Sequence, residues 1–129
     1  MLLKELSELN GVSSGETAVR HFIRNRIQGR VDRIQTDRLG NLIARCDQGK
    51  KGPLVMLSAH MDEVGLMVVG IDASGLLKIK TIGGIDERVL ISKRVFVGPQ
   101  RIPGVIGAKP IHLQEREERE RPVKTTGLF

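Results

Sequence analysis

Aromatic residues and cysteines are nearly absent from this sequence of 129 residues. There is no Trp and no Tyr, and the three Phe residues are Phe22, Phe96 and Phe129. Because proteins bind single-stranded nucleic acids by stacking bases on aromatic rings, such a binding platform is not expected. Cys46 is the one cysteine, which excludes an intramolecular disulfide and a Cys-rich zinc module. A reducing compartment, the cytoplasm, is indicated.

Long apolar runs are also missing, and the charges are not segregated. No stretch approaches the roughly 18 apolar residues of a membrane span, and residues 1–6, MLLKEL, are amphipathic rather than typical of a signal peptide. The formal net charge is +6, but Lys and Arg are scattered. The densest charged run, residues 115–121, alternates in sign as a solvated surface does. We therefore expect neither a membrane nor a nucleic acid as a partner.

The first 30 residues predict two helices. Four leucines recur at helical spacing before Asn10-Gly11 ends the first helix: Leu2, Leu3, Leu6 and Leu9. Ser13, with Glu16 three residues later, has the form of a capping box that starts a second helix. One apolar stripe then continues to Gly29, formed by Val19, Phe22, Ile23 and Ile27.

Short strands are predicted from residue 31 onward. Residues 31–36 and 41–45 are expected to be strands joined by a turn over 37–40. The next expected strand, residues 54–59, begins with Leu-Val-Met-Leu, which is apolar at every position, as in a strand covered on both faces of an α/β sheet. It leads directly into His60. The carboxyl end of a central strand is where open α/β sheets place their ligands.

Beyond Gly65 the pattern becomes all-β. Five short strands separated by Gly-rich turns are predicted over residues 66–71, 76–80, 89–91, 95–97 and 102–106, and their spacing suggests a small barrel or sandwich. We therefore expect residues 1–68 to be the start of an α/β domain and residues 69–129 to be a partial β-barrel. The charged residues 114–124 are expected to be an exposed loop or hairpin.

His60 and Asp62 are the candidate metal-site residues. They lie two apart, so on a strand both side chains face the same side. Imidazole is a common ligand of zinc and related metals, and a nearby carboxylate can orient it, ligate the metal or raise the ligand's basicity. Taken alone, an isolated His-x-Asp is more often a solvated or internally satisfied pair than a metal site. Both interpretations stay open on spacing alone.

A family resemblance adds to this pattern. Residues 55–68, VMLSAHMDEVGLMV, resemble the first metal-binding segment of the tetrahedral and glutamyl aminopeptidase family of cocatalytic metallopeptidases. Residues 11–16 and 37–44 are similar to the family's opening helix and its Asp-x-x-Gly-Asn turn, and residues 82–86 and 104–113 to its inserted β-barrel domain. The segments follow one another in the family's order.

The resemblance implies a metalloaminopeptidase that removes N-terminal residues from peptides. It implies the start of an α/β catalytic domain followed by an incomplete barrel insertion, a homo-oligomer, and two divalent metal ions, zinc or cobalt. His60 is assigned as a ligand of one metal, and Asp62 as the carboxylate of the catalytic site that orients it. The family's other ligands fall beyond residue 129. The chain is therefore expected to be truncated, to hold at most one partial metal site, and to be inactive alone.

Other residues and functions fit less well. The only paired glutamates, Glu117 and Glu118, stand among arginines and lack the Val-Gly that follows the family's catalytic pair. His112 is expected to have a structural or inter-domain role, His21 to be a surface residue, and Glu63 to be a partner for a backbone group or an Arg. The alternatives are a non-catalytic interaction module that uses the barrel segment, and an endoglucanase-type hydrolase. Glycan hydrolysis usually uses two carboxylates, in a cleft lined by aromatics, and Trp and Tyr are missing.

Overall fold

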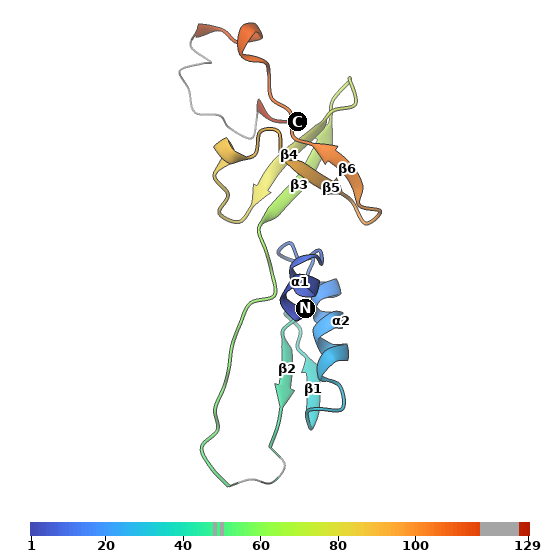
Figure 1. The fold of residues 1–129 in the computed structure, drawn as a ribbon, viewed down its shortest axis with the longest axis vertical. Coiled ribbons are helices and arrows are strands. Elements are labelled where there is room, and N and C mark those ends of the chain that lie inside the picture. The colour runs from blue at the N-terminus through green and yellow to red at the C-terminus, as the bar shows by residue number, and fades with distance from the viewer. Residues whose placement is uncertain (48, 50, 117–126) are drawn as a thin grey trace. The chain divides into compact units, whose positions relative to one another are not determined.

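The chain forms two compact units, Met1–Glu63 and Val64–Phe129. The structure is a computed structural model, and it describes every residue except 48, 50 and 117–126 (Figure 1). The predicted domain boundary after residue 68 lies within the first strand of the second unit and stays a prediction. Among the described residues, no helix has both the length and the hydropathy that crossing a membrane requires.

The first unit begins with the two predicted helices, α1 (Leu2–Ser7) and α2 (Thr17–Ile27). Val19 is the buried residue of α2, and an ion pair between Arg26 and Glu5 joins the two helices. Gly29 follows α2 with a φ of 79°, in the left-handed region that glycine adopts without strain. Both helices therefore form where the apolar spacing predicts them.

The predicted capping box between Ser13 and Glu16 is wrong. Glu16 is itself the N-cap residue of α2, and its carboxylate accepts the backbone N–H of Ser14 at 2.7 Å. Because α2 starts at Thr17, Ser13 lies too early in the chain to cap it. Its hydroxyl is hydrogen-bonded to a residue far along the sequence instead.

A hairpin of β1 (Arg33–Thr36) and β2 (Leu42–Arg45) completes the regular structure of this unit. The predicted turn between them is confirmed. The Asp37 carboxylate accepts the backbone N–H groups of Leu39 and Asn41, both at 2.9 Å, and the Asn41 side-chain amide at 2.8 Å. Arg20 of α2 donates to the Gly40 carbonyl at 2.7 Å, which fixes the turn against the helix.

The strand predicted over residues 54–59 does not form. Residues 53–62 have no regular secondary structure, and the apolar side chains of Leu54, Val55, Met56 and Leu57 are 87%, 75%, 86% and 93% exposed. A buried strand needs a hydrogen-bonded neighbour and covered faces, and the described part of the chain supplies neither. The prediction that this segment is buried is therefore wrong for these 129 residues, which instead expose a contiguous apolar stretch.

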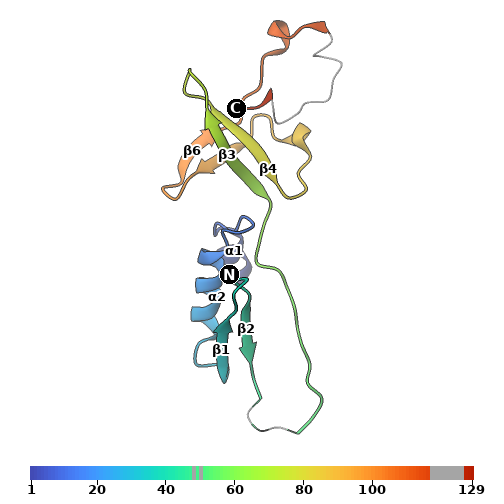
Figure 2. The same ribbon diagram turned by 180° about the vertical axis from the view of Figure 1, so that it is seen from behind.

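The second unit contains two antiparallel ribbons, seen from both sides in Figures 1 and 2. One pairs β3 (Gly65–Ile71) with β4 (Leu77–Ile82), and the other pairs β5 (Arg94–Val97) with β6 (Ile102–Val105). The sheets are separate, so the described residues do not show a closed barrel. Taken together, the chain is a small mixed α/β fragment.

Four of the five strands predicted in this unit are present. The prediction of a strand over residues 89–91 is wrong. A short 3₁₀ helix, η1 (Glu87–Val89), takes its place, and a second one, η2 (Ile111–Leu113), lies further on. Asp86 starts η1 by accepting the Arg88 backbone N–H, and it also binds the Arg88 guanidinium at 2.6 Å. These hydrogen bonds lower the pKa of Asp86 from its ordinary 3.8 to about 2. Local capping therefore overrides the β-branched pattern here.

Leu90, Ile106 and Leu128 form the core of the second unit. They are 8%, 3% and 3% exposed. Around them lie partly buried apolar residues from the ribbons and loops: Leu66, Ile79, Ile85, Val95 and Ala108. Ile106 is also held by its backbone, because its N–H donates to Lys93 and its carbonyl accepts from Ser92, both at 2.9 Å. Ile106 is thus a central packing residue.

Ile106→Ala is expected to lower the free energy of unfolding of this unit by about 2–5 kcal/mol, the usual effect of emptying a packed site. Ile102→Ala is the matched control, since Ile102 is 59% exposed and its change should stay within about 0.5 kcal/mol. Urea unfolding of both variants measures the difference. Equal losses would contradict the described core.

Candidate metal-binding site

His60 and Asp62 lie side by side at the end of the exposed apolar segment. His60 Nδ1 is 2.9 Å from the Asp62 backbone oxygen and 3.3 Å from Asp62 Oδ1. Both oxygens accept hydrogen bonds, so this geometry assigns the proton of a neutral ring to Nδ1. Nε2 then keeps its lone pair, and the side chain is 85% exposed. The ring therefore offers one nitrogen to a ligand from solvent.

Ser13 holds the other oxygen of Asp62. Its hydroxyl donates to Asp62 Oδ2 at 2.6 Å across 49 residues of sequence. This hydrogen bond is the main cause that lowers the pKa of Asp62 below its ordinary 3.8, against partial burial, which raises it. The carboxylate is therefore ionised at neutral pH and can accept from the His60 ring.

Two hydrogen bonds between Gly11 and Glu63 hold Ser13 next to Asp62. The Glu63 N–H donates to the Gly11 carbonyl at 2.7 Å, and the Gly11 N–H donates to Glu63 Oε1 at 3.3 Å. Glu63 thus bonds a backbone group, one of the two partners predicted for it. A Cβ at position 11 would lie 2.9 Å from Val19 Cγ2 and 3.1 Å from the Met61 carbonyl. The close approach of these segments therefore requires glycine there.

The remaining candidate residues lie elsewhere. His21 is exposed on α2, and His112 is exposed in η2 of the other unit. Cys46 is exposed and free, and Glu117 and Glu118 lie outside the described residues. Within the described ranges, no three His, Cys, Asp or Glu side chains are placed to hold a metal ion. His60, held by Asp62, therefore fits one ligand of a metal site and does not complete it.

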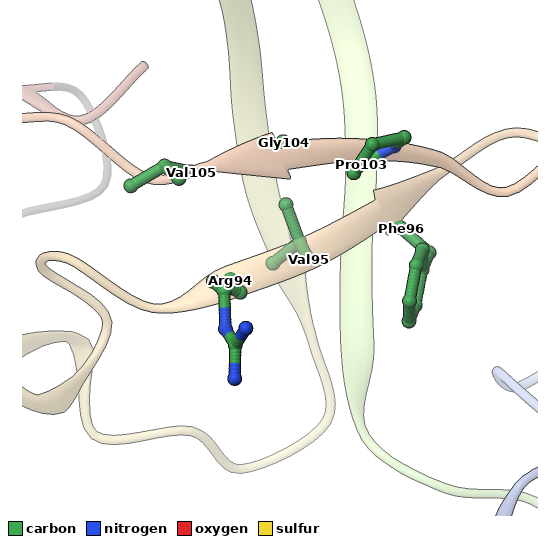
Figure 3. A pocket seen from close by; sticks show the side chains of 6 residues that line it. All are labelled: Arg94, Val95, Phe96, Pro103, Gly104 and Val105. Carbon is green, nitrogen blue, oxygen red and sulfur yellow. The ribbon is translucent and has the colours of Figure 1, made fainter.

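An open pocket over the β5–β6 ribbon is lined by other kinds of side chains than the His60–Asp62 site. It is lined by Arg94, Val95, Phe96, Pro103, Gly104 and Val105 (Figure 3). The Arg94 and Phe96 side chains point to the same side of β5, and the Arg101 guanidinium lies 4.5 Å from the centre of the Phe96 ring. The lining contains no carboxylate, imidazole or thiol. It is not a metal site.

Sequence comparisons connect this arrangement to known proteins. The sequence profile of the family described as M42 glutamyl aminopeptidase matches residues 40–129. A putative aminopeptidase of Escherichia coli, FrvX, is 38% identical over an alignment 131 residues long that covers 99% of this chain and 36% of that protein. The lysyl aminopeptidase of Pyrococcus furiosus is 36% identical over 123 residues, which are 93% of this chain and 35% of that protein. The chain thus spans about a third of these relatives' length.

The chain is also similar to solved structures. The chain is similar to a Thermotoga maritima protein described as an endoglucanase, with a TM-score of 0.80 and 40% identity over 98% of this chain and 36% of that one. It is also similar to the TET1 peptidase of Pyrococcus horikoshii, which assembles into a tetrahedron or a large octahedral shell. There the TM-score is 0.79 and the identity 34%, over 98% of this chain and 38% of that one.

Proposed function

The chain belongs to the M42 glutamyl aminopeptidase family, and from that membership we propose that it is the N-terminal part of a metalloaminopeptidase that removes N-terminal residues from peptides. Membership of the family implies divalent metal ions. The observation that carries the proposal is the His60–Asp62 pair within the matched range, with the ring held at Nδ1 and Nε2 left for a metal. The proposed ions are two in number, zinc or cobalt.

The proposed roles follow from the hydrogen bonds. His60 would ligate one ion through Nε2, and Asp62 would hold the ring in the required tautomer and orientation, as a carboxylate behind a metal-bound histidine does. A bound pair of ions would supply an activated water and an electrophile for the peptide carbonyl. Within this chain, Asp62 is the positioning carboxylate and His60 the ligand.

The 129-residue chain by itself is proposed to be inactive. A bound ion needs several protein ligands, and one imidazole with a supporting carboxylate supplies too few. The rest of the family's length would supply the others. In this proposal residues 1–68 are the start of the α/β catalytic domain, and residues 69–129 belong to the inserted barrel.

The proposal also covers the protein's oligomeric state and its compartment in the cell. The similarity to a TET peptidase supports a homo-oligomer formed by the complete protein. The free, exposed Cys46 supports a reducing compartment, the cytoplasm. Peptides with a free amino terminus are the proposed substrates.

A chimera tests the function directly. Residues 1–129 are joined to the part of the Pyrococcus furiosus lysyl aminopeptidase that follows the matched region, giving what we call the extended chimera. With zinc or cobalt it is expected to release the fluorophore from aminoacyl-coumarin amides, whereas the 129-residue chain with the same metals releases none above background. The two proteins differ because only the chimera contains a full set of ligands.

Two further outcomes separate the alternatives. A folded, metal-loaded chimera that cleaves no aminoacyl amide would contradict the proposal and favour a non-catalytic interaction module. Release of reducing sugar from carboxymethylcellulose without amide cleavage would instead favour the endoglucanase description of the Thermotoga maritima relative.

A further inference from the structure

We propose that Ser13 is a positioning residue of the metal site, because its hydroxyl holds the carboxylate that holds the His60 ring. This inference rests on the proposed function and deepens it. Ser13 Oγ donates to Asp62 Oδ2 at 2.6 Å. Asp62 Oδ1 lies 3.3 Å from His60 Nδ1, which also bonds the Asp62 backbone oxygen at 2.9 Å. Each carboxylate oxygen therefore has a separate partner.

The Ser13 hydroxyl determines how the Asp62 carboxylate is turned. A carboxylate rotates easily about its terminal torsion, and the Asp62 side chain is 41% exposed, so water can compete for either oxygen. Holding Oδ2 fixes the direction of Oδ1 toward His60. Since the His60 side chain is 85% exposed, packing does not orient the ring, which is held by the Asp62 carboxylate together with the Asp62 backbone carbonyl.

The loop that carries Ser13 is held in place without its side chain. The two hydrogen bonds between Gly11 and Glu63 and the parallel bridge between Val12 and Glu63 join the residues just before Ser13 to the residue just after Asp62. Removing the hydroxyl alone is therefore expected to leave the loop in position and to free only the carboxylate. This separates a positioning role from a structural one.

The test compares Ser13→Thr with Ser13→Val, which have nearly the same shape and differ in the hydroxyl. Long-range ¹⁵N NMR of the metal-free 129-residue chain, at a pH where the ring is neutral, reports the His60 tautomer. Wild type and Ser13→Thr are expected to show mainly the Nδ1–H form. Ser13→Val, in which the Asp62 backbone carbonyl still accepts from Nδ1–H, is expected to show a larger share of the Nε2–H form. Ser7→Ala is the control, because the Ser7 hydroxyl bonds the Leu3 and Lys4 carbonyls of its own helix.

The second readout is the zinc affinity of the extended chimera, measured by competition with a chelating dye. Ser13→Val is expected to bind zinc about 10–100-fold more weakly than Ser13→Thr, the usual effect of losing a group behind a metal ligand. The same tautomer and the same affinity in both variants would overturn the role of Ser13. Because the tautomer is measured without metal or substrate, an inactive chimera would count against the function and leave the Ser13 result standing.

Discussion

His60→Gln is expected to lower kcat/KM of the extended chimera for aminoacyl amides by on the order of 10³-fold. A bound metal contributes several kcal/mol of transition-state stabilisation, and a loss of about 4 kcal/mol corresponds to that factor. Glutamine keeps a polar side chain of similar length, but it lacks the ring nitrogen that the Asp62 contact leaves free at Nε2. Steady-state kinetics at saturating zinc measures the effect.

Two matched histidine variants control for the loss of an imidazole. His21 and His112 are exposed, and the Asp62 carboxylate is in contact with Ser13 and His60 instead, so His21→Gln and His112→Gln should leave kcat/KM within about twofold. If His60→Gln stays within the same range, His60 is not a metal ligand. If His112→Gln causes the large loss instead, the metal ligand is His112, in the proposed barrel segment.

Local sequence patterns predicted the elements that local interactions stabilise. The spacing of apolar residues predicted α1 and α2, and the Asp37 turn predicted the β1–β2 hairpin, because Asp37 bonds groups within four residues of itself. The strand predicted over residues 89–91 does not form, because a different local interaction is stronger there. Their β-branched character is outweighed by Asp86, which caps η1 through Arg88.

Long-range contacts could not be predicted in the same way. The spacing of His60 and Asp62, together with the family resemblance, indicated a metal site, and the structure brings the two side chains together. Ser13 was missed because its partner lies 49 residues away and because the nearer Glu16 offered a familiar local pattern. The serine occurs in the segment 11–16 that resembles the family, which is the one signal that pointed toward it.

Leu57→Asn is expected to destabilise the extended chimera by about 2.5–6 kcal/mol while changing the 129-residue chain by less than about 0.5 kcal/mol. In this chain the Leu57 side chain is 93% exposed, and exposed substitutions have small effects. In the chimera the added sequence is proposed to cover the segment as a sheet strand. Asparagine would then lose the transfer free energy of a buried leucine, about 1.5–3 kcal/mol, and would bury an amide without partners, at about 1–3 kcal/mol.

Urea unfolding of both proteins measures this difference, and Leu57→Met is the control at the same position. Methionine is apolar and of similar volume, so it should cost less than about 1.5 kcal/mol in either protein. The comparison isolates burial, since the substitution, the neighbouring sequence and the assay are the same, and only the length of chain differs. Equal, small losses for Leu57→Asn in both proteins would show that this apolar segment stays in solvent at the family's full length. His60 would then stand at the end of an exposed segment rather than at the carboxyl edge of a sheet, and it would lack the rigid support that a metal ligand needs.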